Sequence, residues 1–267
     1  MKISVIVPTY KPQVYLWECL DSIYNQTFPK TEYELILVLN GCNEPYNAQI
    51  KDWLAKHSDL QVQYIQTDEA GVSNARNMAL DVARGGYISF VDDDDYISTF
   101  CLEELYKKVS QNTIALCYPY AFNDGNINEQ IQYSITEAYE YCTSHKCKLL
   151  TSKVRRFFNG PCMKLIPMSF IQDRRYDIKF KNGEDSLFMF LISDKIKRIA
   201  FTSKKAIYYR RYRNDSAVTR KRNKSKIIIN SFNLIKAYSC IYFKTPKSYS
   251  LSFLITRLLG TLRSMSK

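Results

Sequence analysis

Residues 87–95 read YISFVDDDD, a short apolar strand that ends in four consecutive aspartates. Like charges repel more strongly beside low-dielectric protein than in water, so a cationic partner is expected at this strand end. Because side chains alternate along a strand, Asp92 and Asp94 point to the same side. Two such carboxylates suit Mg²⁺ or Mn²⁺, which also bind diphosphate oxygens. The alternative is an exposed acidic loop that caps the helix beginning near Thr99.

Around this strand, short β-branched runs alternate with longer amphipathic segments. The runs at 3–7, 34–39, 62–66 and 87–91 predict strands, and the segments at 14–26, 46–56 and 72–83 predict helices. Strands that alternate with helices indicate a mostly parallel sheet with helices on its faces. The predicted fold class is therefore α/β.

The second half of the chain is less regular. It predicts helices at 99–110 and 184–193, strands at 113–121, 196–201 and 206–211, and two last helices within 225–266, broken around Pro246. Residues 123–160 hold polar turns and one further helix. A small helical appendage is therefore expected after the α/β part.

The carboxyl ends of the first four strands are polar. They read PTY at 8–10, NGC at 40–42, TDE at 67–69 and four aspartates at 92–95. In an open parallel sheet the ligand crevice lies beyond these ends. We therefore expect the binding site at this edge of the sheet.

Charge divides the chain unevenly. The formal net charge is +12 over 267 residues, but residues 1–100 carry −7 and residues 145–267 carry +23. A basic second half indicates an anionic ligand or partner, such as a diphosphate, lipid head groups or nucleic acid. The eight cysteines lack C-x-x-C spacing, which argues against zinc ribbons and disulfide frameworks.

Neither a secretory signal nor a spanning helix is indicated. The apolar run at residues 3–7 has no cleavage site behind it and predicts a strand. An uncharged apolar run of about 18 residues, as a spanning helix needs, does not occur. The chain is expected in the cytoplasm, with peripheral association at the inner membrane face as a further prediction.

Four segments in this order resemble the family 2 glycosyltransferases of the GT-A fold. They are VIVPTY at 5–10, GVSNARN at 71–77, FVDDDD at 90–95 and GED at 183–185. The resemblance covers about residues 1–220. It implies a GT-A catalytic domain at 1–220, with a donor-binding half (1–110) and an acceptor-side half (111–220), followed by a basic helical region at 221–267.

The resemblance also implies roles for individual residues. The donor nucleotide is expected to contact Pro8, Thr9, Tyr10, Arg76, Asp92 and Asp93, and Asp94 is the expected ligand of Mn²⁺ or Mg²⁺. Arg211 and Arg213 are expected to bind the leaving diphosphate, which suits the planar guanidinium. Some relatives have a metal-binding His at the position of Arg213, so the metal here is expected to rely on Asp94, donor oxygens and water.

One position departs from the family pattern. Many members have an acidic residue after the second strand, where this chain has Asn40. The amide still offers a donor and an acceptor to a pyrimidine edge. A UDP-sugar is favoured as the donor, but this departure leaves the base less defined.

Catalysis is assigned to the GED segment. The family places its base at the aspartate of this pair, so Asp185 is the expected base, with Glu184 beside it. A carboxylate there takes the proton of the acceptor hydroxyl as it attacks the anomeric carbon, which inverts the configuration. Lys164 is expected to orient acceptor or phosphate, and the acceptor is expected to be a glycan or a lipid-linked glycan.

Several alternatives remain open at this level. The apolar and basic stretch at 251–263 either lies in a membrane interface or packs on the catalytic domain or on a second copy. The basic run Arg220–Lys226 is compatible with a non-catalytic binder of polyanions or nucleic acid. A nucleotidyltransferase on a similar scaffold is the third hypothesis. For the transferase itself, no specific nucleic-acid partner is expected.

Overall fold

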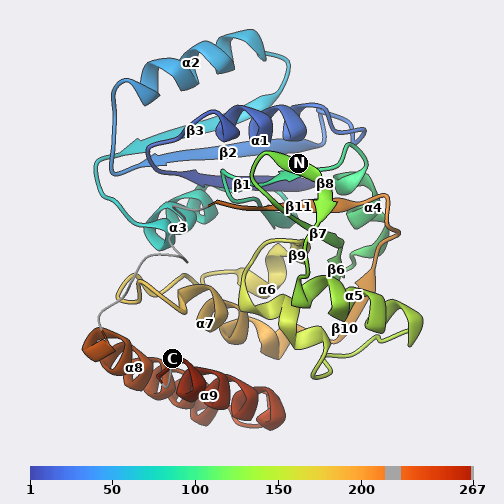
Figure 1. Ribbon diagram of the computed structural model, residues 1–267, viewed down its shortest axis with the longest axis vertical. Coiled ribbons are helices and arrows are strands. Elements are labelled where there is room, and N and C mark those ends of the chain that lie inside the picture. Colours follow the sequence, from blue (N-terminus) through green and yellow to red (C-terminus); the bar gives the residue numbers. More distant parts are fainter. Residues whose placement is uncertain (214–223, 266–267) are drawn as a thin grey trace.

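The computed structural model describes residues 1–213 and 224–265 (Figure 1). The predicted domain boundary at 220/221 lies outside the described residues. So do the end of the predicted arginine segment, residues 214–216, and the first part of the basic run, residues 220–223.

A large mixed sheet forms the centre of the molecule. Within residues 1–213, seven strands hydrogen-bond in the order β10-β6-β9-β4-β1-β2-β3. They are β1 (Ile3–Thr9), β2 (Tyr33–Asn40), β3 (Gln61–Thr67), β4 (Tyr87–Phe90), β6 (Thr113–Leu116), β9 (Lys164–Pro167) and β10 (Arg198–Phe201). All neighbours are parallel except β9, which is antiparallel to β4 and to β6. The predicted mostly parallel α/β sheet is confirmed.

The two central strands explain why this sheet forms. Every residue of β1 and β2 is buried, as expected for β-branched and aliphatic runs covered on both faces. The pairing of β1 with β2 and β4 brings Thr9, Asn40 and the residues after Phe90 to one edge. This edge is the predicted binding edge.

The structure corrects one strand. The predicted strand at 113–121 is two strands in two sheets, because the chain leaves the large sheet at Cys117. There the Cys117 amide donates to Met163, and the next amide, of Tyr118, donates to Ala206. The single apolar run at 113–121 therefore contains a change of sheet that its sequence pattern does not indicate.

A second sheet lies beside the first within residues 1–213. Its strands are β5 (Tyr96–Ile97), β7 (Tyr118–Asn123), β8 (Asn126–Gln130) and β11 (Ile207–Tyr212), in the order β5-β11-β7-β8. Strands β5, β8 and β9 were not predicted. They are short, and β8 is exposed throughout, so they carry little hydrophobic periodicity.

Helices surround the sheets. They are α1 (Tyr15–Tyr24), α2 (Tyr46–Lys56), α3 (Val72–Val82), α4 (Cys101–Lys108), α5 (Ser134–Ser144), α6 (Met168–Ile171), α7 (Glu184–Leu191), α8 (Lys224–Lys244) and α9 (Leu251–Met265), with 3₁₀ turns η1 (Val154–Asn159) and η2 (Ser193–Lys195). The eight cysteines are free thiols. Among the described helices, none has both the length and the apolar character needed to cross a membrane.

The last two helices form a hairpin that packs on the α/β body. In Figure 1, α8 and α9 run side by side next to α7, at the end of the molecule away from α2. Leu234 and Tyr238 of α8 and Phe253 and Leu254 of α9 are buried in the common core. Phe253 contacts the rings of Phe158 and Phe190. Of the alternatives for residues 251–263, packing on the catalytic domain is thus observed for one face of the hairpin.

Candidate active site

Three of the four aspartates after β4 form a tight acidic cluster. Carboxylate oxygens of Asp92, Asp94 and Asp95 lie within 4.8 Å of one another. Asp95 is fully buried, whereas the Asp92 side chain is partly open to solvent. So close a group of carboxylates requires cations for its stability.

Arginines from β11 and the residue after it supply these cations. Arg210 Nη1 donates to Asp92 (2.9 Å) and to Asp95 (2.8 Å). Arg213 donates to Asp94 Oδ2 through Nε (2.9 Å) and Nη2 (2.6 Å). The second sheet is therefore joined to the first by ion pairs at the expected binding edge.

Arg211 follows Arg210 in the strand, so its side chain lies on the opposite face of the strand. Its Nε donates to the Asp94 carbonyl (2.9 Å), and its other nitrogens pair with Asp124 (2.7 Å) and with Glu18. Both predicted diphosphate residues, Arg211 and Arg213, thus border the cluster, and their predicted role stays a prediction.

Burial and pairing set different pKa values within the cluster. Burial raises the pKa of Asp92, but Arg76 and Arg210 outweigh it and hold this pKa below its usual value. Burial raises the pKa of Asp93 to about 7, and the charges of Asp94 and Asp92 add to the effect of burial. The pKa of Asp95 is likewise raised to about 7, mainly by burial, although Arg210 lowers it.

Arg76 connects this cluster to the GED segment. Its guanidinium is 3% exposed and donates through Nη2 to Asp92 (2.9 Å) and through Nη1 to Asp185 (2.6 Å). It also lies over the ring of Tyr176, 5.5 Å from its centroid. Asp92 and Asp185, 93 positions apart in the sequence, are thereby held on one buried cation.

Asp185 is a carboxylate with an upward-shifted pKa. Burial raises its pKa, and the charge of Arg76 opposes that shift. A carboxylate poised above its usual pKa is typical of general acid–base residues. Its neighbour Glu184 shares the first turn of α7. The roles predicted for both residues stay predictions.

The strand-end residues are arranged around Asn40. The Asn40 amide nitrogen donates to the Thr9 carbonyl (2.7 Å), and its oxygen accepts from the Gly71 amide (2.9 Å). The Thr9 hydroxyl donates to Asp93 Oδ2 (2.5 Å). Asn40 thus fastens the ends of β1 and β2 to the start of α3, and its predicted contact with the base stays a prediction. Pro8 is buried in β1, and Tyr10 is exposed at the rim.

Lys164 lies beneath the site rather than at its surface. It is 1% exposed, and its Nζ donates to the carbonyls of Gly160 (2.7 Å) and Cys162 (2.6 Å). Burial lowers its pKa to about 8, while the Asp185 carboxylate acts to raise it. The structure places Lys164 near the predicted base, with its donors directed at the backbone.

Two contributors were not found from the sequence. Arg210 and the buried Tyr208 both face Asp95, whose Oδ2 accepts from the Tyr208 hydroxyl (2.8 Å). The period of two along the strand separates 208 and 210 from 209 and 211, so this signal was present. It did not show which face meets the aspartates, because that depends on how the second sheet docks.

The cluster fits a divalent cation. Its donors are hard carboxylate oxygens, which Mg²⁺ and Mn²⁺ prefer. Asp94 Oδ1 accepts no hydrogen bond from the described residues, since Arg213 uses Oδ2. Asp95, in contrast, accepts three hydrogen bonds, one of them from the Arg211 amide. Asp94 is therefore the best-suited ligand, with Asp92 beside it.

Comparison with known proteins identifies the family. Residues 4–179 match the model of glycosyl transferase family 2. The chain belongs to this family. TarS of Staphylococcus aureus, a poly(ribitol-phosphate) beta-N-acetylglucosaminyltransferase, is 30% identical over 215 residues, which cover 78% of this chain and 35% of TarS. The glycosyltransferase GlyA of Streptococcus pneumoniae is 32% identical over 207 residues, 73% of this chain and 29% of GlyA. The chain spans about a third of the length of these family 2 relatives.

Solved structures show the same fold. Residues 1–349 of TarS in complex with UDP-GlcNAc match with a TM-score of 0.75 at 24% identity, covering 99% of this chain and 72% of that one. The mannosyltransferase PcManGT of Pyrobaculum calidifontis, in complex with GDP-Man and Mn²⁺, matches with a TM-score of 0.61 at 15% identity, covering 99% and 73%. The GT-A fold class expected for this family 2 chain is confirmed.

We predict that Asp94→Asn weakens Mn²⁺-dependent binding of UDP by about tenfold or more, because even outer-shell partners of a metal contribute 10–100-fold. The amide still accepts from Arg213, so the fold is expected to stay intact. Isothermal titration of UDP with and without Mn²⁺ measures the effect, and the exposed Asp81→Asn is the control. An affinity equal to that of the unaltered protein would exclude Asp94 as the ligand.

Proposed function

We propose that this chain transfers a sugar from a nucleotide-sugar donor, with a UDP-sugar favoured, to a hydroxyl of a glycan or lipid-linked glycan, with inversion. The observation that carries the proposal is the buried guanidinium of Arg76, which holds Asp92 and Asp185 together. In a family 2 chain, Arg76 thereby holds Asp92, the carboxylate proposed for the donor side, at a fixed position relative to Asp185, the candidate base.

The reaction is a single displacement. The acceptor oxygen bonds to the anomeric carbon while the bond from that carbon to the diphosphate oxygen breaks. The hydroxyl proton passes to the Asp185 carboxylate, and the electron pair leaves on the nucleoside diphosphate. Arg76 holds Asp185 in position and neutralises Asp92, which limits repulsion between that aspartate and the donor phosphates.

The relatives support the donor and acceptor classes. TarS has been crystallised with UDP and with UDP-GlcNAc, which favours a UDP-sugar here. TarS and a Bacillus spizizenii relative are named for transfer onto poly(ribitol-phosphate), a hydroxyl-rich polymer. An acceptor with repeated hydroxyl groups therefore suits the proposal.

We assign Mn²⁺ or Mg²⁺ to Asp94, with Asp92 as its neighbour. When bound, such a cation would neutralise charge on the donor diphosphate. This assignment is supported by the Oδ1 of Asp94, which accepts no hydrogen bond from the described part of the chain. A binder of polyanions that performs no chemistry would have no use for the acidic cluster or for an aspartate with a raised pKa.

We further propose peripheral association with an anionic membrane face through the helical hairpin. One stripe of α9 carries Leu251, Ile255, Leu259 and Leu262, which are 47–54% exposed. On α8, Ile229 and Phe232 are about 60% exposed. Residues 224–265 contain seven lysines and arginines and no acid. Apolar side chains among basic ones suit an anionic lipid interface.

We expect Asp185→Asn to lower kcat by roughly 10²–10⁴-fold, because a positioned base contributes that much and the amide cannot take the proton. Donor affinity is expected to change little, since Arg76 keeps an oxygen acceptor. Turnover and UDP-sugar affinity are measured on the same preparations, with Glu184→Gln as the neighbouring comparison. Normal turnover in Asp185→Asn combined with a loss in Glu184→Gln would move the role to Glu184.

The pH profile gives a second test of the base. Asp185 must be ionised to accept a proton, and burial raises its pKa, so kcat/KM should rise with pH through a midpoint above the ordinary aspartate pKa of about 3.9. Arg76 lowers this pKa, so Arg76→Gln should move the midpoint to higher pH. The control is Arg175→Gln, because Arg175 is only partly buried and pairs with Asp81, away from the cluster. A midpoint that stays fixed in Arg76→Gln contradicts the assignment.

Membrane association is tested by co-sedimentation of the full chain with liposomes. Binding is expected with anionic liposomes at low salt and should weaken at high salt, because each nearby basic residue contributes about 1 kcal/mol. Replacing Ile255, Leu259 and Leu262 by Ser should weaken it further. Replacing the exposed Val14 and Ile178 by Ser is the control. A chain that stays in the supernatant with anionic liposomes, or whose stripe instead mediates dimers in gel filtration, overturns the proposal.

A further inference from the structure

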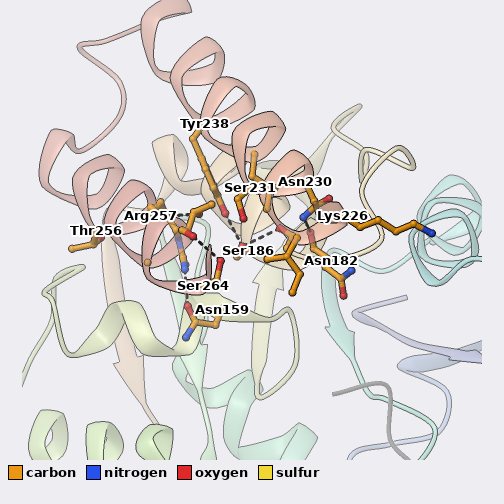
Figure 2. A pocket seen from close by; sticks show the side chains of 15 residues that line it. Asn159, Asn182, Ser186, Lys226, Asn230, Ser231, Tyr238, Thr256, Arg257 and Ser264 are labelled. Atoms are coloured by element: carbon orange, nitrogen blue, oxygen red, sulfur yellow. Dashed lines mark hydrogen bonds between the residues drawn. The ribbon is translucent and has the colours of Figure 1, made fainter. Parts of the chain in front are cut away.

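A pocket of about 690 Å³ lies between the helical hairpin and the start of α7. Figure 2 shows side chains from α8, α9, α7 and the end of η1 converging on it. Its lining is mostly amides and hydroxyls, such as Asn159, Asn230 and Tyr238. A pocket of this size accommodates a small-molecule ligand or a few units of a chain.

Among the described residues that line this pocket, the charged ones are Lys226 and Arg257. Arg257 donates to Asn159 Oδ1 and to the Phe158 carbonyl, both uncharged. Its Nε is buried and has no hydrogen-bond partner among the described residues. Burial lowers the pKa of Arg257 to about 10. A desolvated cation that has no carboxylate partner among residues 1–213 and 224–265 favours an anionic ligand.

The pocket adjoins the predicted base. Gly183 and Ser186 line it, and Asp185 lies between them in the same turn of α7. Lys164 lies within electrostatic reach of both sites, since Asp185 raises its pKa and Arg257 lowers it. The pocket therefore lies against the same turn of α7 that carries Asp185, whose own carboxylate is directed at Arg76.

We propose that this pocket is an acceptor subsite for polyol or sugar units that carry a phosphate. The guanidinium of Arg257 recognises the phosphate, and Lys226 adds positive charge at the rim, where Figure 2 shows it extending outward. The surrounding amides and hydroxyls match the hydroxyl groups of the ligand. This inference rests on the proposed transferase function and adds to it the chemical class of the acceptor and its place.

The existing contacts leave polar groups for such a ligand. Ser186 and Tyr238 hydrogen-bond each other through their hydroxyls (2.6 Å), and Asn230 donates to the Asn182 carbonyl (3.0 Å). Each of these side chains retains further donor or acceptor capacity. When the phosphate of such a ligand lies at Arg257, the hydroxyl groups of its polyol or sugar unit therefore have polar partners on both walls of the pocket.

The first test fills the pocket without disturbing the fold. Gly260 lines the pocket in α9, and a Cβ there would meet no atom within 4 Å. Gly260→Leu therefore adds bulk while raising helix propensity, and Gly260→Ala is the matched control that keeps the volume nearly unchanged. Titration with ribitol 5-phosphate is expected to show at least a tenfold loss of affinity in Gly260→Leu and none in Gly260→Ala. Equal affinity in both variants overturns the site.

The second test concerns charge. Lys226→Gln should weaken ribitol 5-phosphate binding several-fold, whereas Lys236→Gln, an exposed lysine of the same helix that does not line the pocket, should not. Ribitol and inorganic phosphate serve as partial probes and are expected to bind at least tenfold more weakly. Ribitol that binds as well as its phosphate overturns the anionic assignment. Phosphate that binds as well as ribitol 5-phosphate overturns the polyol assignment.

Failure of the subsite is distinguishable from failure of the transferase. UDP-sugar binding with Mn²⁺ is measured in the same Gly260 variants and should be unchanged, because the pocket contains none of the residues assigned to the donor. Normal donor binding without ribitol 5-phosphate binding rejects the subsite alone. Loss of nucleotide binding in the unaltered chain rejects the proposed function itself.

Discussion

The structure depends on the neutralisation of three clustered carboxylates, those of Asp92, Asp94 and Asp95, at the end of β4. Buried charges without partners are strongly unfavourable, so this strand end is stable only with cations beside it. Arg76 comes from α3, and Arg210 and Arg213 come from more than 110 residues further along the chain. The need for these arginines fixes where the small sheet docks on the large one. Folding and site assembly are consequently the same event here.

Arg76 is the most constrained of these cations. It is almost fully buried, and removing one partner from a buried ion pair typically costs 3–5 kcal/mol. Because it holds Asp92 and Asp185 at once, the carboxylate predicted for the donor side and the predicted base cannot shift independently. The electrostatics then separate the two carboxylates: the pKa of Asp92 lies below its usual value, and that of Asp185 lies above it. One arginine thus supports a permanent anion and a titratable group.

Sequence reasoning recovered the periodic part of this arrangement. The strands β1 to β4 and the helices between them lie within a few residues of their predicted bounds, because short apolar runs and amphipathic segments are local patterns. It failed where pairing is non-local. The switch of sheet at Cys117, the short β9 and the direction of Arg210 depend on contacts with distant segments, which periodicity does not encode. Asn40 shows the same limit at the site: its residue type did not predict that its amide joins Thr9 to Gly71, and its contact with a base stays a prediction.

The helical hairpin belongs to the site as well as to the surface. Gly183 precedes the acidic pair with φ = +83°, a conformation that favours glycine. A Cβ at this position would lie 2.6 Å from Leu234 Cδ1 of α8. The glycine therefore does two things: it turns the chain into α7, and it lets α8 pack directly against that turn. Since Asp185 lies in the turn and Arg257 of α9 lines the neighbouring pocket, a hairpin that shifts on the body moves the base and the pocket together. This coupling connects the basic, apolar end of the chain to the chemistry at the edge of its sheet.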